Sequence, residues 1–262
     1  MKKNKLREVL KAGRLAIGTW FLVKCPEAVE AAGAAGFDFV IIDTEHGSYD
    51  LESVVEMIRA AESQGATPIV RTPDGSLKEI KRALDAGAVG ILVPDVRTGE
   101  EASQIIRFTK YETEGRRGSC PVVRATMYGI TDWKTYTEWC EENTMVWALI
   151  EHTDGVRNID SIVSAGVDAI MLGPFDLCMS MGLKGDRFHP DVTKALTHVT
   201  EVACSKGVDV VAVLAGPEPE EFLEEAKFWK SKGCRLITTI IDTQYLSYNY
   251  QRVLAKFREF RE

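Results

Sequence analysis

The chain has 262 residues, of which 45% are hydrophobic and 27% are charged, and its formal net charge at pH 7 is −7. This composition excludes a disordered chain, a collagen-like repeat and a small disulfide-stapled scaffold, and the length suits one large domain. The acidic balance argues against a nucleic-acid partner, and no run of 18 apolar residues could span a membrane.

The first eleven residues are basic and include Lys2, Lys3, Lys5, Arg7 and Lys11. No apolar region follows them, so we expect a solvated first helix and no secretion signal. The six cysteines are dispersed without a C-x-x-C pair, which favours reduced thiols over disulfides or a zinc site. Together these features predict a cytoplasmic protein.

A recurring pattern then runs along the chain: a small or basic residue, a glycine, two variable residues and a short apolar run. It occurs at residues 35–38, 86–89, 165–168, 206–209 and 232–235. A helix that ends on a left-handed glycine and is followed at once by a buried strand produces this pattern. Amphipathic windows with helical spacing lie between the repeats. The pattern therefore predicts alternating strands and helices.

Eight apolar runs qualify as strands, and eight strand–helix units in a chain of this length are typical of a (β/α)8 barrel. The expected strands are residues 15–20, 38–43, 67–71, 90–94, 145–151, 168–172, 208–214 and 235–241. Intervals 95–144 and 174–207 are longer than one helix requires, so we expect insertions that cover an active-site mouth. We expect residues 1–262 to form a single α/β domain, with an open doubly wound sheet as the alternative.

In such a barrel the reactive side chains stand at the carboxyl ends of the strands. Polar residues follow most of the expected strands, whereas the seventh ends in the apolar pair 213–214. The polar strand ends are residues 43–47 (Asp-Thr-Glu-His-Gly), Arg71, Asp95, Glu151 with His152, residues 173–176 (Gly-Pro-Phe-Asp), and Asp242. A histidine, an arginine and several carboxylates at one rim are suited to metal-assisted carbonyl chemistry.

Glu151 and Asp176 follow adjacent strands. Two carboxylates so placed could bind a hard divalent cation and leave positions open for water and substrate. Each could equally cap the helix that follows it.

Arg71 and His46 also have two interpretations each. The Arg71 guanidinium suits a carboxylate or a developing enolate oxygen, but it could form a rim salt bridge with Asp43 or Asp74. His46 could act as a base if a carboxylate orients it, or it could be an ordinary hydrogen-bonded loop histidine.

Three kinds of catalytic signature are missing from the sequence. The loops after the last two expected strands lack the glycine-rich character of phosphate sites, which disfavours phosphorylated substrates. No strand ends in a lysine suited to a Schiff base, so a metal is the favoured electron sink. The G-x-S-x-G signature of serine hydrolases is also absent.

At these residues the chain resembles the HpcH/HpaI aldolase family, which contains metal-dependent class II pyruvate aldolases of 2-keto-3-deoxy and 4-hydroxy-2-oxo acids. The resemblance covers nearly the whole chain, from Gly18 to the last strand. It is carried by residues 35–38, 43–47, 70–71, 84–88, 150–151 and 173–177. Each segment alone is a weak signal, but the ordered set at matching strand ends is specific.

The resemblance implies a TIM barrel of the phosphoenolpyruvate/pyruvate-domain type, assembled as a homohexamer, a trimer of dimers, with an exchanged C-terminal helix. It implies that Glu151 and Asp176 ligate Mg²⁺, Mn²⁺ or Co²⁺, which chelates the oxoacid. The backbone amides of Phe175 and Asp176 would bind its carboxylate. Arg71 would neutralise the pyruvate enolate, and His46 would move the proton.

The resemblance assigns supporting roles to further residues. An acid matching Asp85 raises the basicity of the histidine in the family, and the acid matching Asp43 lies near it. The other residues placed at the substrate are Gly173, Pro174, Trp20 and Leu214, the last two on the aldehyde side. The expected partners are a small oxoacid and an aldehyde.

The sequence departs from the family pattern at two places. Leu149 stands where the family usually has glutamine, and Tyr-Glu-Thr-Glu at 111–114 replaces an aromatic residue followed by two prolines. Residues 150–152 also resemble siderophore-type citrate synthases of the same scaffold. A related condensation or decarboxylation of an oxoacid is therefore an alternative to aldol cleavage. A binding barrel without turnover is a third possibility, against which the presence of both His46 and Arg71 argues.

Overall fold

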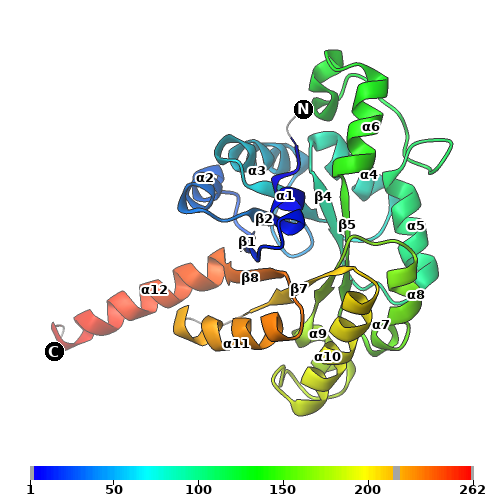
Figure 1. Ribbon diagram of the computed structural model, residues 1–262. Coiled ribbons are helices and arrows are strands. Elements are labelled where there is room, and N and C mark those ends of the chain that lie inside the picture. The colour runs from blue at the N-terminus through cyan, green and yellow to red at the C-terminus, as the bar shows by residue number, and fades with distance from the viewer. Residues whose placement is uncertain (1–2, 215–218, 261–262) are drawn as a thin grey trace.

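The computed structural model describes residues 3–214 and 219–260. Its centre is a closed barrel of parallel strands in chain order, β1 to β8 (Figure 1). The strands are β1 (Ala16–Phe21), β2 (Phe39–Asp43), β3 (Thr67–Arg71), β4 (Gly90–Val93), β5 (Met145–Ile150), β6 (Ala169–Leu172), β7 (Asp209–Val213) and β8 (Leu236–Ile241). Each lies within one residue of its predicted bounds. The (β/α)8 prediction is confirmed, and the open sheet is excluded.

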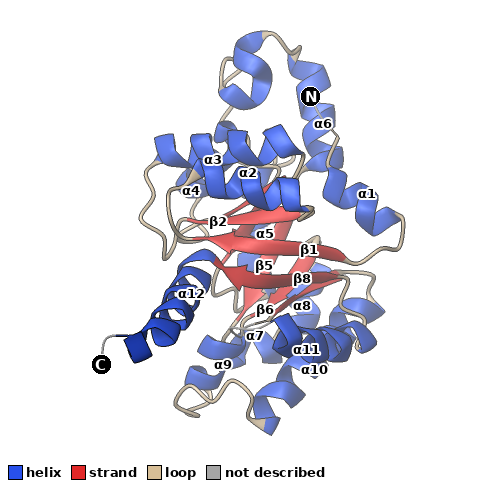
Figure 2. Cartoon of the chain, turned by 90° about the vertical axis from the view of Figure 1, so that its left-hand side faces the viewer, coloured by secondary structure: helices blue, strands red, loops and turns tan. Residues whose placement is uncertain are grey.

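Helices surround the strands (Figure 2). They are α1 (Lys5–Lys11), α2 (Pro26–Ala35), α3 (Leu51–Gln64), α4 (Leu77–Ala86), α5 (Gly99–Thr109), α6 (Trp133–Asn143), α7 (Thr153–Arg157), α8 (Ile159–Ser164), α9 (Pro174–Ser180), α10 (Pro190–Ser205), α11 (Pro219–Ser231) and α12 (Asp242–Phe257), with 3₁₀ turns η1 (Arg124–Gly129) and η2 (Arg258–Phe260). Gly36 and Gly87 end α2 and α4 with φ of 105° and 104°, three residues before the next strand. The prediction that helices end on a left-handed glycine is confirmed at these two positions, because φ in this range favours glycine.

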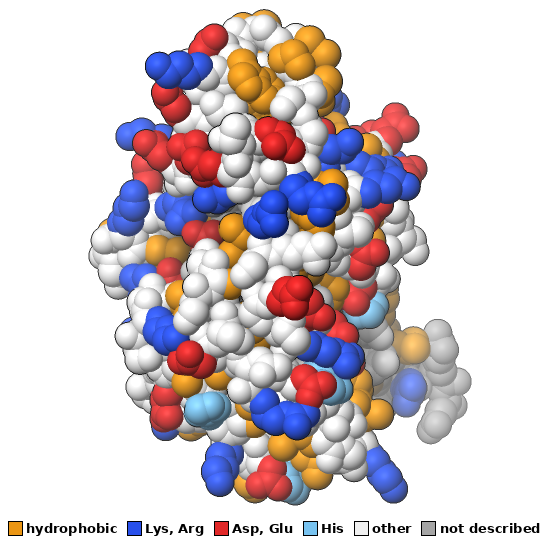
Figure 3. Space-filling model, turned by 90° about the vertical axis from the view of Figure 1, so that its right-hand side faces the viewer, with side chains coloured by type: hydrophobic (Ala, Val, Ile, Leu, Met, Phe, Trp, Pro, Cys, Tyr) orange, Lys and Arg blue, Asp and Glu red, His pale blue; other side chains and the backbone are white. Residues whose placement is uncertain are grey.

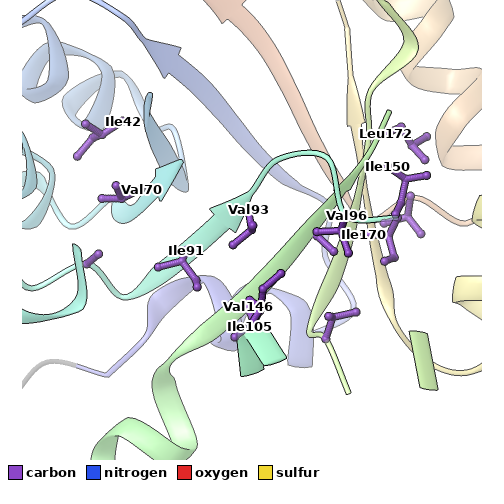
Figure 4. Close-up of a cluster of buried hydrophobic side chains, with 14 of the residues drawn as sticks. Ile42, Val70, Ile91, Val93, Val96, Ile105, Val146, Ile150, Ile170 and Leu172 are labelled. Carbon is purple, nitrogen blue, oxygen red and sulfur yellow. The ribbon is translucent and has the colours of Figure 1, made fainter. Parts of the chain in front are cut away.

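The core has two layers because strand residues alternate between the two faces of the barrel wall. Phe39 and Ile41 point into the barrel, whereas Val40 and Ile42 pack against the helices. Figure 4 shows part of this outer layer, where side chains of β2 to β6 meet those of α5. The strands are therefore buried on both faces, as their continuous apolar sequences predicted.

Helix α1 closes the amino-terminal end of the barrel. Its Leu6, Val9 and Leu10 are buried against the interior cluster, and the Arg7 guanidinium donates 2.7 Å hydrogen bonds to Asp168 and to the Thr144 carbonyl. The expectation of a fully solvated first helix is wrong, because the apolar residues between its lysines share one face. The open end of the barrel is the carboxyl end.

The first long interval does not lie where we expected. Its α6 leads directly into the amino end of β5, and Arg117 pairs with Asp85 near the end of α4. This insertion therefore covers the amino-terminal side of the barrel and not the mouth at the carboxyl end. The second interval begins with α9, directly after β6, and so starts at the mouth.

Helix α12 extends away from the barrel (Figures 1 and 2), and none of its described residues is buried. Its exposed apolar side chains are Tyr245, Leu246, Tyr250, Val253, Leu254 and Phe257. None of the described helices is both long enough and apolar enough to cross a membrane.

Candidate functional site

The turn after β2 is built around the buried carboxylate of Asp43. Its Oδ1 accepts hydrogen bonds from the backbone N–H groups of Glu45 (3.1 Å) and His46 (3.2 Å). The chain then closes on Gly47, whose N–H donates to the Asp43 carbonyl; a Cβ at that position would lie 2.3 Å from the same oxygen. Glycine is required by this close approach, and the turn sets the direction in which residues 45 and 46 project.

Arg71 lies beside Asp43 because the two residues are register partners at the ends of β3 and β2. Its Nε donates to Asp43 Oδ1 (2.8 Å), a terminal nitrogen donates to the other oxygen, and Nη1 lies 3.1 Å from Glu45 Oε2. The rim salt bridge between Arg71 and Asp43 is therefore present. A guanidinium has five N–H groups, so these contacts leave two of them for a ligand.

Trp20, on β1, covers one face of the Arg71 guanidinium, whose central carbon lies 4.9 Å from the ring centroid. Both side chains are buried. A cation over an aromatic face is attracted to the ring electrons, and the contact fixes the plane of the guanidinium. The Trp20 indole N–H is buried and has no hydrogen-bond partner among the described residues.

His46 projects from the mouth, with 62% of its side chain exposed. Its Nε2 lies 3.9 Å from Glu45 Oε2. Burial raises the pKa of Glu45, while the positive charges of Arg71 and His46 oppose that rise. A carboxyl with a raised pKa beside an exposed imidazole forms a pair between which a proton can pass.

Glu151 follows β5 and is positioned by the backbone of Asp95, whose N–H donates to Oε1 at 2.8 Å. Burial raises the pKa of Glu151 to about 7, and the negative charges of Asp176 and Glu45 add to the effect. Gly173, at the end of β6, makes the approach possible, since a Cβ there would lie 2.5 Å from the Glu151 Cβ. Glu151, Glu45 and Asp176 thus form one acidic group.

Asp176 lies in the first turn of α9, where Gly173 is the N-cap and Pro174 the first helical residue. Asp176 therefore does not cap the helix, and His152, not Glu151, caps α7. The N–H groups of Phe175 and Asp176 belong to the first turn and have no partner within the helix. The positive end of the α9 dipole therefore lies at Asp176, which belongs to the acidic group.

The donor set of this group suits a hard divalent cation. Carboxylate oxygens are the ligands that Mg²⁺ and Mn²⁺ prefer. The negative charge of Asp176 helps to raise the pKa of Glu151 and of Glu45, and a bound cation would offset this repulsion. Among the described residues no group of three or more His, Cys, Asp and Glu side chains could hold a metal. Glu151 and Asp176 would therefore supply two ligands and leave the remaining positions to water and substrate.

Two predicted residues lie elsewhere. Asp85, near the end of α4, accepts a 2.7 Å hydrogen bond from Arg117 at the opposite end of the barrel from His46. Within one chain it does not act on that histidine, because the helix runs antiparallel to the strands and ends at their amino side. Leu214 is 1% exposed and packs in the outer layer. It shares that orientation with Ala212, and its place on the aldehyde side stays a prediction.

Three contributors to the mouth were not assigned from sequence. Glu45 was visible as an acid at a strand end, but its contact with Arg71 depends on the turn. The Asp95 backbone N–H gives no sequence signal. Asp242, after β8, accepts hydrogen bonds from the N–H groups of Leu22 and Val23 and so anchors the chain after β1.

Comparison with known proteins supports the resemblance seen in the sequence. The family model described as HpcH/HpaI aldolase/citrate lyase matches residues 16–240. A 5-keto-4-deoxy-D-glucarate aldolase of Escherichia coli O139:H28 is 37% identical over 205 residues, which are 78% of this chain and 79% of the relative.

Two crystal structures match almost the whole chain. An HpcH/HpaI aldolase/citrate lyase family protein from Burkholderia cenocepacia J2315 has a TM-score of 0.88 and 31% identity, covering 98% of this chain and 100% of its own. The citrate synthase SbnG has a TM-score of 0.86 and 29% identity, with 98% of each chain covered. The chain belongs to the HpcH/HpaI aldolase/citrate lyase family.

Proposed function

We propose that the protein is a divalent-metal-dependent carbon–carbon lyase that reversibly cleaves a 4-hydroxy-2-oxo acid or 2-keto-3-deoxy acid to pyruvate and an aldehyde. The observation that carries the proposal is the grouping of Arg71, His46, Glu151 and Asp176 at the carboxyl end of the barrel. A cationic guanidinium with free N–H groups beside a carboxylate pair is the arrangement that enolate chemistry requires.

Glu151 and Asp176 would hold Mg²⁺, Mn²⁺ or Co²⁺. When bound, the cation would act as a Lewis acid that withdraws electrons from the 2-oxo group and lowers the barrier to enolate formation. The first turn of α9, from Gly173 and Pro174 to the amides of Phe175 and Asp176, would bind the oxoacid carboxylate, since unpaired N–H groups at a helix start favour anions.

Residues of the chain itself would move the proton of the substrate hydroxyl and neutralise the charge of the enolate. His46 takes the proton of the substrate hydroxyl, directly or through a water. The carbon–carbon bond then breaks, its electron pair passes to the pyruvate enolate, and the aldehyde is released. The two remaining Arg71 N–H groups face the enolate oxygen, held in place by Asp43, Glu45 and Trp20. Return of the proton to carbon completes pyruvate.

The Escherichia coli relative supports a choice of substrate class. In 5-keto-4-deoxy-D-glucarate the hydroxyl on carbon 3 lies two carbons from the keto group, so cleavage between carbons 3 and 4 gives pyruvate and a three-carbon hydroxyaldehyde acid. We infer that the protein accepts a 2-oxo acid of this kind, with Trp20 lining the aldehyde side.

The test is pyruvate release from 5-keto-4-deoxy-D-glucarate and from a panel of shorter 4-hydroxy-2-oxo acids, with Mg²⁺ or Mn²⁺ present. We expect pyruvate and aldehyde in equal amounts from at least one of them, and no product after chelation. Product that is insensitive to a chelator would contradict the proposed mechanism.

Condensation or decarboxylation of an oxoacid is the second candidate. It is favoured by the likeness to the citrate synthase SbnG over 98% of both chains and by the apolar Leu149 beneath the site. Consumption of oxaloacetate without any pyruvate–aldehyde adduct would support it over the aldolase. If wild type bound oxoacids but turned over none of the tested substrates, and Arg71→Ala changed nothing, the barrel would instead be a binding protein.

A further inference from the structure

A cavity lies far from the acidic group, at the amino-terminal end of the barrel. It has a volume of about 700 Å³ and lies between the first insertion and the starts of β3 and β4, where Pro68 and Val89 form part of its wall. Cavities of this size accommodate small organic ligands. The site of the proposed reaction, at the other end of the strands, shares none of its lining residues.

The wall of this cavity is largely apolar. Tyr136 and Trp139 of α6 stack with ring centroids 6.4 Å apart, and Leu84, Ala88 and Met127 line the other sides. Figure 3 shows apolar side chains gathered at the top of the molecule, over the insertion. Such a wall favours a ligand with an aromatic or branched aliphatic body.

The charge of the lining is positive although the whole chain carries −7. Five cationic side chains line the cavity, whereas the only carboxylate among its described lining residues is Glu62. The five are Lys3, Lys5, Arg59, Arg117 and Arg124. Glu62 is engaged by Arg124 at 2.5 Å. The exposed Lys5 and Arg59 lie in a region of excess positive charge, which attracts anions.

The environment of Arg117 is a second observation on this cavity. It is 1% exposed and lies 4.6 Å over the Tyr111 ring. One terminal nitrogen donates to Asp85 (2.7 Å) and to the Tyr136 hydroxyl (3.2 Å), but its buried Nε has no hydrogen-bond partner among the described residues. A buried N–H without an acceptor is costly, so an acceptor supplied by a ligand would stabilise it.

We propose that this cavity is a binding site for a small organic anion with an apolar body, such as an aromatic or branched carboxylate. The anionic group lies among the cationic side chains, and the apolar body packs on Tyr136 and Trp139. The site is separate from the proposed lyase site, so it can be tested without any assay of catalysis.

The experiment is a fluorescence titration of the full chain with 8-anilinonaphthalene-1-sulfonate, compared with its uncharged analogue N-phenyl-1-naphthylamine. We expect one saturable site for the sulfonate and at least tenfold weaker binding of the neutral amine. In the double variant Lys5→Gln/Arg59→Gln the affinity for the sulfonate falls about five- to tenfold, because two exposed charges are lost. Lys78→Gln/Lys194→Gln, with the same charge change at exposed sites outside the cavity, leaves it unchanged.

A cavity-filling variant locates the site. Ala125 lines the cavity, so Ala125→Trp should abolish sulfonate binding, whereas Ala34→Trp on the exposed face of α2 should retain it. Thermal melts of both variants report whether the fold is kept, and the charge variants test the site even if Ala125→Trp misfolds. Three results would overturn the proposal. They are an unchanged affinity in Lys5→Gln/Arg59→Gln, equal binding of the two dyes, and no saturable binding to wild type because a second copy covers this face.

Discussion

The central residue of the mouth is Arg71, which is fixed by two carboxylates and an aromatic face. Asp43 and Glu45 engage three of its N–H groups, and Trp20 covers the guanidinium plane. A side chain held in this way needs no reorganisation when charge develops on a substrate oxygen, and that preorganisation is what electrostatic catalysis depends on.

Arg71→Lys should lower kcat by about 10²- to 10³-fold with a smaller change in KM, because an ammonium can neither bind Asp43 through two parallel bonds nor present the remaining N–H groups in the same plane. Steady-state pyruvate release measures this. The matched control is Arg82→Lys, whose partner Glu79 lies one turn away on α4. Wild-type kcat in Arg71→Lys would remove Arg71 from the chemistry.

Glu151→Gln should change stability in a pH-dependent way in the cation-free protein. The pKa of Glu151 is about 7 in the folded chain and near its ordinary value of 4.5 when unfolded. Between these values only the folded state holds the proton, so wild-type stability falls as pH rises from about 4.5 to about 7.

Because glutamine carries no charge, Glu151→Gln should be more stable than wild type at pH 8, by on the order of 2 kcal/mol, with little difference at pH 5. Urea unfolding at the two pH values measures the effect. An equal difference at both would contradict the assigned ionisation. Added Mn²⁺ should reverse the order at pH 8, since only the carboxylate binds it well.

Sequence reasoning reached the chemistry of these side chains but not all of their contacts. A salt bridge of Arg71 with Asp43 or Asp74 was one of two interpretations left open, and the pair with Asp43 forms because the two residues end neighbouring strands. Glu45 was not assigned, since its burial depends on a turn that closes on Gly47. The packing of Leu214 in the outer layer was not predicted, because its orientation depends on a one-residue alternation that an apolar run does not reveal.

At the scale of elements, the junction of β6 with α9 positions the acidic group. Gly173 allows the end of β6 to pass against Glu151, and α9 then begins at once with Pro174. This segment holds the first turn of α9, which carries Asp176, against the end of β5, so the spacing of the two carboxylates depends on a residue without a side chain.

Gly173→Ala should weaken Mn²⁺ binding at least tenfold, because the new Cβ would lie 2.5 Å from the Glu151 Cβ and displace that side chain. Isothermal titration calorimetry measures the affinity. Gly118→Ala is the control, since the nearest atom to its new Cβ is 3.8 Å away. Equal affinities in the two variants would show that Glu151 is not held by this contact.

The elements differ in how well sequence predicts them. All eight strands were located within one residue, since a positive-φ glycine and a doubly buried strand leave a strong combined pattern. The insertion with α6 was assigned to the wrong end of the barrel, because the length of an interval does not tell which rim it covers. Its anchor, the pair of Arg117 and Asp85, joins residues 32 positions apart.

At the scale of the whole molecule, α12 is a helix without any buried residue among those described. It projects from the barrel with a row of exposed apolar side chains, including Leu246, Tyr250 and Val253. Monomeric proteins rarely leave such a face uncovered. We therefore propose a homohexamer, a trimer of dimers, in which α12 packs on a neighbouring copy.

Leu246→Glu/Val253→Glu should dissociate this assembly into smaller species without unfolding the barrel, because two charges would enter an apolar contact. Light scattering coupled to size-exclusion chromatography gives the mass, and circular dichroism confirms the fold. Gln251→Glu, which adds a charge at another exposed position of α12, is the control. A monomeric wild type, or a double variant of unchanged mass, would contradict the role of α12.

The barrel as a whole was predictable because eight repeats of one local pattern leave few topologies. How copies of the chain pack together was not predictable from the residues, since a single chain shows only which face is left uncovered. Asp85 and His46 lie at opposite ends of the barrel within one chain. Only the assembled protein tests whether a neighbouring copy brings the two residues together.

The most direct test of the account is deuterium exchange into the methyl group of pyruvate, followed by proton NMR in D₂O. It detects enolate formation whichever aldehyde is the natural product. With Mn²⁺ added before the exchange and removed before the spectrum, wild type should exchange the methyl protons, whereas Arg71→Ala, Glu151→Gln and chelator-treated protein should not. Exchange that persists without the cation would contradict a metal-assisted enolate at this site. So would a wild type that releases pyruvate from its substrate but does not exchange the methyl protons.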